Sequence, residues 1–127
     1  FIARHGLDKY QMNPHFPVIS LQIIRGAVAA NMDGYLEDYL DKVLVHMWEE
    51  PKKMDDPEVI KAAFEESGLD AEKLMAQMQD PEVKSTLISN TEAAAERGVF
   101  GIPTFFVGEE MYFGKDTLWQ VEEKLSE

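Results

Sequence analysis

Residues 98–107 read GVFGIPTFFV, and this stretch decides how the rest of the chain is interpreted. Pro103 directly precedes an apolar, aromatic run, 104–107, that has the composition of a strand. Proline cannot donate a ladder hydrogen bond, so within a sheet it is confined to edges, strand starts and bulges. The stretch therefore predicts a strand that either simply begins at Pro103 or follows a special bend against which a ligand binds.

The residues that follow predict a hairpin and a closing helix. Two strand-like runs, TFFV at 104–107 and MYF at 111–113, flank residues 108–110, which indicates a hairpin with a short turn. Gly114 closes the hairpin, and Asp116 is expected to cap a last helix. An isolated two-stranded hairpin is marginal in water, so we expect the sheet to be completed elsewhere.

Five helices are predicted upstream of the hairpin, each marked by apolar residues at helical spacing. We expect the first to begin at Pro17 and to end near Asn31. The second begins after Gly34 and is stopped by Pro51. The first helix carries the apolar residues Val18, Leu21, Ile24 and Val28, and the second carries Leu36, Tyr39, Leu40, Val43, Leu44 and Met47.

The motif DPEV occurs twice, at 56–59 and at 80–83. Aspartate caps the free N–H groups of a helix start, and proline suits the next position. Nothing else recurs, so we interpret the motif as two similar helix starts and not as an internal repeat. The first of these helices ends at Gly68, a short helix capped by Asp70 follows, and the second ends at Gly98.

The amino-acid composition excludes several classes of function. The chain has 127 residues, which suits one domain or a small domain with an elaboration. Its 24 acidic and 12 basic residues give a net charge of −12, which argues against nucleic acid or an anionic membrane surface as a partner. There is no cysteine, so a disulfide or dithiol within this chain is excluded, and a cytoplasmic location is expected.

Familiar catalytic motifs are missing, and the stretch 98–117 is what remains. The three histidines lack metal-ligand spacing, so no metal is expected. If the Ile102–Pro103 bond is cis, the backbone of Ile102 is turned outward and can pair with an extended peptide. The helix start after Gly114 would attract a carboxylate, while Asp116 could accept from an ammonium group. A zwitterionic amino-acid end would satisfy both, although Asp116 could equally be a simple cap.

Three stretches carry a resemblance to a known family. They are NPHFPVISLQIIRGAVAA at 13–30, DPEVKSTLISNTEAAAERGVFGIPTFFVG at 80–108 and MYFGKDTLWQVEEKL at 111–125. They resemble the 2-hydroxychromene-2-carboxylate isomerase family, relatives of kappa-class glutathione transferases and of DsbA-like oxidoreductases. The resemblance implies an α/β thioredoxin-like fold, mostly helical in this chain. Residues 1–98 would be an inserted helical domain, and 99–127 the C-terminal ββα half of the thioredoxin domain.

The resemblance also implies a glutathione site. Pro103 would be the cis-proline beside the active site, and Ile102 would hydrogen-bond the cysteinyl backbone of glutathione. Gly114, Lys115 and Asp116 would lie at its γ-glutamyl end. The sequence departs from the family's pattern at the next position, where Thr117 replaces the arginine often seen in the family.

Asn13, Pro14 and His15 match a family segment that borders the aromatic side of the pocket. The implied partner is a small aromatic carboxylate, and a homodimer is expected. In the family, the serine that activates the thiol lies in a βαβ unit, which would precede Phe1. No catalytic residue is therefore assigned within this chain.

The implied activity is a glutathione-dependent isomerisation in aromatic catabolism. Two alternatives stay open. One is a DsbA-like thiol–disulfide oxidoreductase, whose redox motif would also precede Phe1. The other is a non-catalytic dimeric fragment. Residues encoded before Phe1 would discriminate, because a serine-proline start favours the isomerase and a CxxC motif favours the oxidoreductase.

Overall fold

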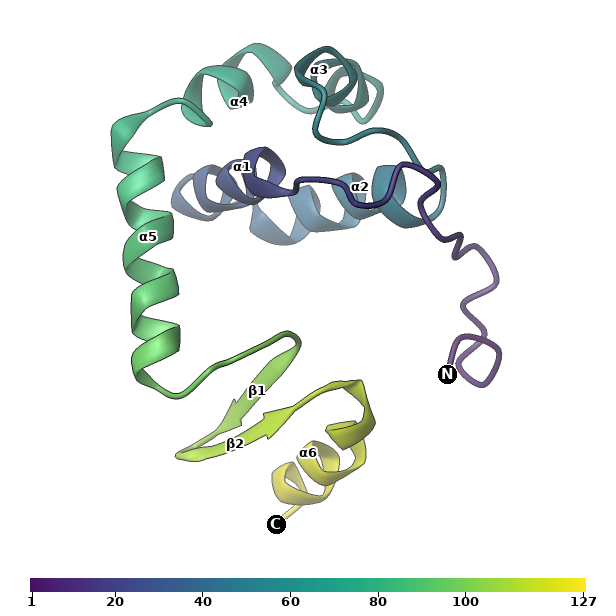
Figure 1. Cartoon of the computed structure of the whole chain (residues 1–127), viewed down its shortest axis with the longest axis vertical. Helices are drawn as coiled ribbons and strands as arrows, with labels where there is room; N and C mark the ends of the chain where they lie inside the picture. Colours follow the sequence, from purple (N-terminus) through teal and green to yellow (C-terminus); the bar gives the residue numbers. More distant parts are fainter. The chain divides into compact units, whose positions relative to one another are not determined.

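The computed structural model describes all residues 1–127 and contains six α-helices and one two-stranded sheet. The chain divides into two compact units, Phe1–Leu87 and Ile88–Glu127, and each is described by itself. The division falls inside helix α5 (Pro81–Glu96), which is drawn as one continuous helix in Figure 1. The domain boundary expected after residue 98 stays a prediction.

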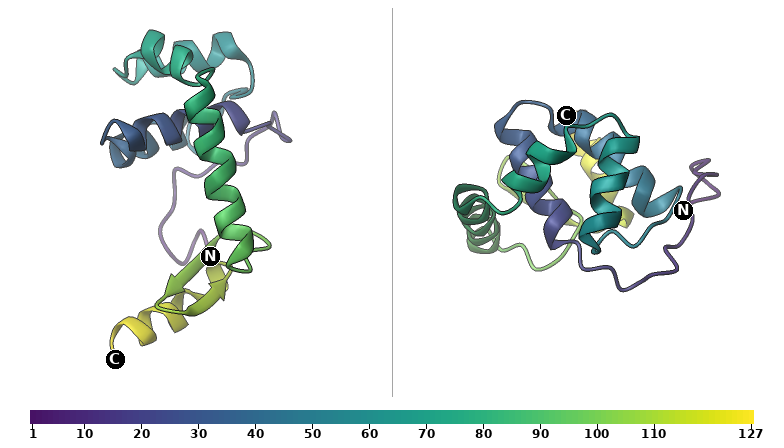
Figure 2. Two further views of the ribbon diagram at one scale, coloured as in Figure 1. Left: turned by 90° about the vertical axis from the view of Figure 1, so that its left-hand side faces the viewer. Right: turned by 90° about the horizontal axis from the view of Figure 1, so that it is seen from above.

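The first unit is a small helical bundle. Its helices are α1 (Leu21–Met32), α2 (Leu36–Trp48), α3 (Pro57–Glu66) and α4 (Ala71–Gln77). α1 packs against α2 and α4, and α3 packs against α2 and α4. Residues before α1 form an irregular segment, purple in Figure 2. The largest fully buried apolar side chains are Tyr39, Phe64, Met54, Ile60, Leu74 and Met78.

Three of the four predicted aspartate caps are present, at Asp56, Asp70 and Asp80. The side chain of Asp56 accepts from the backbone N–H of Glu58 at 3.0 Å, and Asp70 accepts from Lys73 at 3.1 Å. The second DPEV motif behaves like the first, since Asp80 accepts from the N–H of Glu82 at 2.7 Å. Both DPEV motifs therefore start helices, as the sequence predicts.

The start of α1 differs from the prediction. The helix begins at Leu21 and not at Pro17. The N–H of Ile19 donates to the carboxylate of Asp55 at 3.0 Å, so this part of the chain is tied to a distant loop and not wound into a first turn. The first helical bond runs from Ile24 N–H to the carbonyl of Ser20.

The buried face of α1 also differs from the predicted one. Leu21 and Ile24 are more than two-fifths exposed, while the face that includes Gly26 is buried. The reason is Tyr39 of α2, whose ring lies where a side chain at position 26 would be. Its hydroxyl donates to the carbonyl of Ile23 at 2.7 Å. The two helices thus pack through a small-residue face that apolar spacing alone does not identify.

The second unit holds a hairpin and a short helix. β1 (Thr104–Val107) pairs antiparallel with β2 (Glu110–Phe113), and α6 (Leu118–Leu125) packs against both strands. Glu110 pairs with Val107, so the turn is formed by residues 108–109 and not by 108–110 as predicted. No residue from 88 to 127 is buried, so this unit has no core of its own.

The last helix does not begin as predicted. A 3₁₀ turn, η1 (Lys115–Thr117), precedes α6, and Thr117 occupies the N-cap position. Asp116 lies inside that turn and caps nothing. Its carboxylate instead pairs with the ammonium of Lys115. None of the helices in the structure combines the length and the hydropathy that crossing a membrane requires.

Candidate functional site

The approach to β1 presents an unpaired stretch of backbone at Ile102. The Ile102–Pro103 peptide bond is cis, the geometry that the resemblance implies. Ile102 is 90% exposed, and neither its N–H nor its C=O has a hydrogen-bond partner within the chain. Just after it, the hydroxyl of Thr104 donates to the carbonyl of Gly101 at 2.6 Å, which fixes the bend. Two polar backbone groups are thus presented to an incoming extended ligand.

A hydrogen bond joins this bend to the turn after β2. The N–H of Gly114 donates to the carbonyl of Pro103 at 2.8 Å, which extends the hairpin ladder by one step. The ring centroids of Phe100 and Phe113 lie 4.6 Å apart. A Cβ at Gly101 would meet the Phe113 ring at 2.8 Å, so this position must stay small. The structure therefore brings the two predicted glutathione segments together.

The turn itself carries a charge pair at the surface. Gly114 has φ +89° and ψ 154°, a backbone conformation that is essentially restricted to glycine. Its carbonyl accepts from the hydroxyl of Thr117 at 2.8 Å and from the Thr117 N–H at 3.1 Å. The ammonium of Lys115 lies 2.9 Å from the carboxylate of Asp116, whose side chain is 86% exposed. One cation and one anion are thus offered side by side.

The residues that the resemblance places on the substrate side, Asn13, Pro14 and His15, belong to the first unit. Asn13 is only 2% exposed, and its side-chain amide donates to the carbonyls of Met47 at 3.2 Å and Lys52 at 3.0 Å. Its side-chain oxygen accepts from the N–H of His15 at 2.9 Å. Pro14 and His15 themselves are exposed. Asn13 is therefore an anchor of this segment, and Pro14 and His15 are the residues that it presents.

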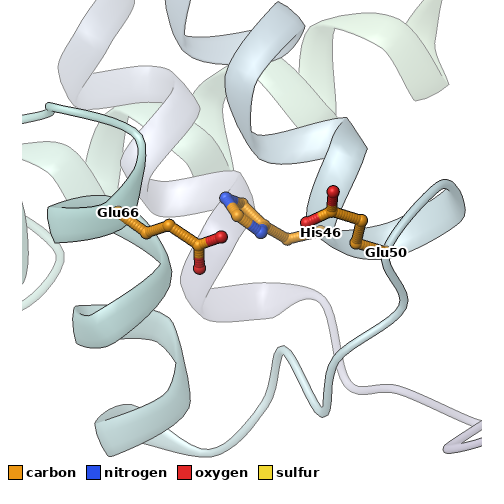
Figure 3. Close-up of side chains that lie close together, drawn as sticks. All are labelled: His46, Glu50 and Glu66. Atoms are coloured by element: carbon orange, nitrogen blue, oxygen red, sulfur yellow. The ribbon is translucent and has the colours of Figure 1, made fainter.

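A further cluster of polar side chains lies beside this anchor, and sequence reasoning missed it. Figure 3 shows His46 of α2 between Glu50, just after that helix, and Glu66 at the end of α3. The Lys52 ammonium lies 2.6 Å from Nδ1 of His46, 3.3 Å from Glu66 and 3.9 Å from Glu50. The lysine thus supplies the positive charge that the two carboxylates face.

The signal for this cluster was present but incomplete. His46 and Glu50 are four residues apart, a spacing that brings side chains together near a helix end. Glu66 joins them only through the packing of α2 against α3, and Lys52 joins them through the loop that follows α2, where its N–H donates to the carbonyl of His46. No local spacing rule could identify those two partners.

The comparisons with known proteins agree with this architecture. The family model of the DSBA-like thioredoxin domain matches residues 4–126. Human glutathione S-transferase kappa 1 is 29% identical over 135 aligned positions, which cover 92% of this chain and 58% of that protein. The 2-hydroxychromene-2-carboxylate isomerase of Pseudomonas putida is 56% identical over 32 residues, 25% of this chain and 16% of that enzyme. 

A solved structure points the same way. Selenomethionine 2-hydroxychromene-2-carboxylate isomerase matches with a TM-score of 0.75 and 26% identity, over 85% of this chain and 53% of that one. The fold is therefore thioredoxin-like, as predicted. The chain belongs to the DSBA-like thioredoxin domain family. It spans little more than half the length of the kappa-class transferase and of the solved isomerase.

Proposed function

We propose that this chain is the helical and C-terminal part of a glutathione-dependent isomerase that acts on small aromatic carboxylates. The observation that carries the proposal is the bond between Pro103 and Gly114, because it places an unpaired backbone stretch beside a surface charge pair. The similarity to a kappa-class glutathione transferase and to an isomerase supports the same function.

The backbone of Ile102 would hold the middle of glutathione. A peptide in extended conformation pairs with an exposed backbone edge through its own N–H and C=O groups. Ile102 presents both kinds of group, and both lack a partner in the chain. Such pairing reads the peptide backbone and not its side chains, so it suits a cysteinyl residue whose thiol must stay free.

Lys115 and Asp116 would hold the γ-glutamyl end. This end of glutathione carries one carboxylate and one ammonium group. The carboxylate can replace Asp116 as the partner of the Lys115 ammonium, and the ammonium can replace Lys115 as the partner of Asp116. The exchange keeps every charge paired. The arginine often seen at position 117 in the family is absent, so this end makes one contact fewer.

Glutathione held by Ile102, Lys115 and Asp116 would supply reversible thiolate-addition chemistry at the conjugated double bond of the substrate. The residues of this chain bind and orient. Ile102 and Asp116 fix the direction of the tripeptide, and the segment of Asn13, Pro14 and His15 would border the aromatic carboxylate. Holding both reactants in one geometry is a large part of catalysis in such a reaction.

A calorimetric titration with reduced glutathione tests the proposal. We expect saturable binding to the 127-residue chain and about fivefold weaker binding to Asp116→Asn, the effect of losing one charged hydrogen bond at an exposed site. Glu109→Gln is the matched control, because it removes one exposed carboxylate from the turn at the other end of the hairpin. The proposal fails if glutathione at millimolar concentration gives no saturable heat, or if both variants bind like the original chain.

The family model favours one alternative, a DsbA-like thiol–disulfide oxidoreductase. The same backbone edge at Ile102 would then hold an extended substrate protein. The chain contains no cysteine, so any dithiol would belong to another segment. The titration separates the two functions, because an oxidoreductase of this kind has no use for a site that recognises the γ-glutamyl zwitterion through Asp116.

A further inference from the structure

The segment 10–15 is fastened to the C-terminal end of α2. The last carbonyls of a helix lack intrahelical partners, and here side chains and backbone of this segment supply them. The N–H of Gln11 donates to the carbonyl of Trp48, and its side chain donates to the carbonyl of Glu49 at 2.9 Å. The amide of Asn13 reaches further, to Met47 and to Lys52 beyond the helix. The position of Asn13 thus depends on where Lys52 lies.

Lys52 is held at both ends by one residue, His46. Its backbone N–H donates to the carbonyl of His46 at 2.8 Å. Its side-chain ammonium lies 2.6 Å from Nδ1 of the same residue, and the carboxylate of Glu66 lies 3.3 Å away. A continuous series of hydrogen bonds therefore leads from the His46 ring through Lys52 to Asn13.

The proton on the His46 ring decides whether the side-chain contact in this series, between the ring and the Lys52 ammonium, holds. A lysine ammonium only donates, so Nδ1 must carry a lone pair in this arrangement. The ring is then neutral, and Nε2 donates its proton to Oγ of Ser67 at 2.7 Å. A second proton on the ring would sit on Nδ1 and would face the ammonium. Two donors of like charge cannot share that contact, so it must open.

We propose that His46 and Lys52 are positioning residues for the Asn13–Pro14–His15 segment, which the neutral ring holds in place through the lysine and which protonation of the ring releases. That this segment borders a substrate rests on the proposed function. The hydrogen bonds that position it do not, and the test below reads the segment without glutathione or substrate.

The surroundings of His46 favour the neutral ring. The pKa of the imidazole lies below its ordinary value of 6.5, mainly because the ring is buried and secondly because the Lys52 ammonium is near it. The carboxylates of Glu66 on α3 and Glu50 after α2, together with a backbone hydrogen bond with Ala63, act in the opposite direction. The segment is therefore held at neutral pH, and release is expected only in acid, below about pH 6.5.

Amide hydrogen exchange measured by NMR tests the proposal. The reporter is the backbone N–H of His15, which donates to the side chain of Asn13. We expect its protection factor, which is already corrected for intrinsic exchange, to fall several-fold between pH 7.5 and 5.5. Lys52→Met keeps the length of the side chain without its charge. It should lower the protection about tenfold at pH 7.5, remove the pH dependence, and raise the pKa of the His46 ring.

Lys53→Met is the matched control, because Lys53 is the adjacent, exposed lysine and makes no ion pair. It should change neither the His15 protection nor the His46 ring. A His15 amide that is equally protected in Lys52→Met and in the original chain would overturn the positioning role. A protection factor that is constant from pH 7.5 to 5.5, while the His46 ring itself titrates, would overturn the role of the proton. Neither result would bear on glutathione binding at Ile102 and Asp116.

Discussion

At the scale of single residues, His46 makes the stability of the chain depend on pH. The residue is 2% exposed, and the pKa of its ring is lowered, chiefly by burial. The unfolded chain therefore binds a proton at this position more readily than the folded one, and stability rises with pH wherever that is so. We expect the free energy of unfolding to fall as the pH drops from about 7 through 6.5, and to level off once the folded ring is protonated too. Urea denaturation at a series of pH values measures this.

Lys52→Met supplies the comparison. Removing the ammonium removes the second cause of the lowered pKa, so the fall in stability between pH 7 and 5.5 should become smaller. Two carboxylates affect the stability in a lower pH range. The pKa values of Asp33 and Glu110 are lowered, mainly by hydrogen bonds from Gln77 and Tyr112 respectively, so their contributions are lost only below about pH 4.5. A profile without any change between pH 7 and 5.5 would contradict the assignment to His46.

Gly114 is the second single residue for which the structure makes a specific prediction. Its backbone conformation costs a residue with a Cβ about 1–3 kcal/mol, although the space around a Cβ is open. We expect Gly114→Ala to weaken the bond to the Pro103 carbonyl and to reduce any glutathione affinity at Asp116. Gly34→Ala, at φ +83° in the first unit and also in open space, is the control. It should destabilise the first unit and leave the hairpin chemical shifts of an NMR spectrum unchanged.

At the scale of elements, the close approach of α1 and α2 depends on Gly26. A Cβ there would overlap the hydroxyl of Tyr39, which is buried and donates to Ile23. We expect Gly26→Ala to destabilise the chain by about 1–3 kcal/mol, the usual cost of overpacking, even though alanine favours helix. Chemical denaturation with an unchanged m value would show it.

A double-mutant cycle identifies the contact. Tyr39→Phe alone loses one hydrogen bond, at a cost of about 1 kcal/mol. Combined with Gly26→Ala, it should cost less than the sum of the two single changes, because the atom nearest to the new methyl group is gone. If the destabilisation of the double mutant equalled the sum of the two single effects, the alanine at position 26 would not act through its contact with the Tyr39 hydroxyl.

The elements also show what local sequence could predict. Asp-Pro starts, glycine stops and the apolar, aromatic run at 104–107 depend on neighbours in the chain, and the helices, the caps at Asp56, Asp70 and Asp80 and the hairpin followed from them. The start of α1 depends on Asp55 and its buried face on Tyr39, both of which are distant in sequence. The candidate site divides in the same way. The residues of 98–117 and the resemblance together pointed to Ile102 and Asp116, whereas the His46–Lys52 pair required the tertiary structure.

At the scale of the whole molecule, the two units differ in how they are stabilised. The first buries a core that includes Phe64, Ile60 and Leu74, each at 0% exposure. The second buries no residue, so its hairpin and the helix packed on it have little buried apolar surface to stabilise them. Sheet edges left unpaired are places where another strand can add. The homodimer expected from the sequence is one way to cover them, and it stays a prediction.

Hydrogen exchange followed by mass spectrometry tests this difference. We expect amides in α2 and α3 to open only by global unfolding of the first unit, and amides in β1 and α6 to exchange at least a hundredfold faster, because few buried contacts resist their opening. Sedimentation velocity across a range of concentrations shows whether self-association slows exchange in the second unit. If β1 is as well protected as α3 in a dilute, monomeric sample, then the second unit is stable without a partner, and its exposed apolar residues serve another purpose.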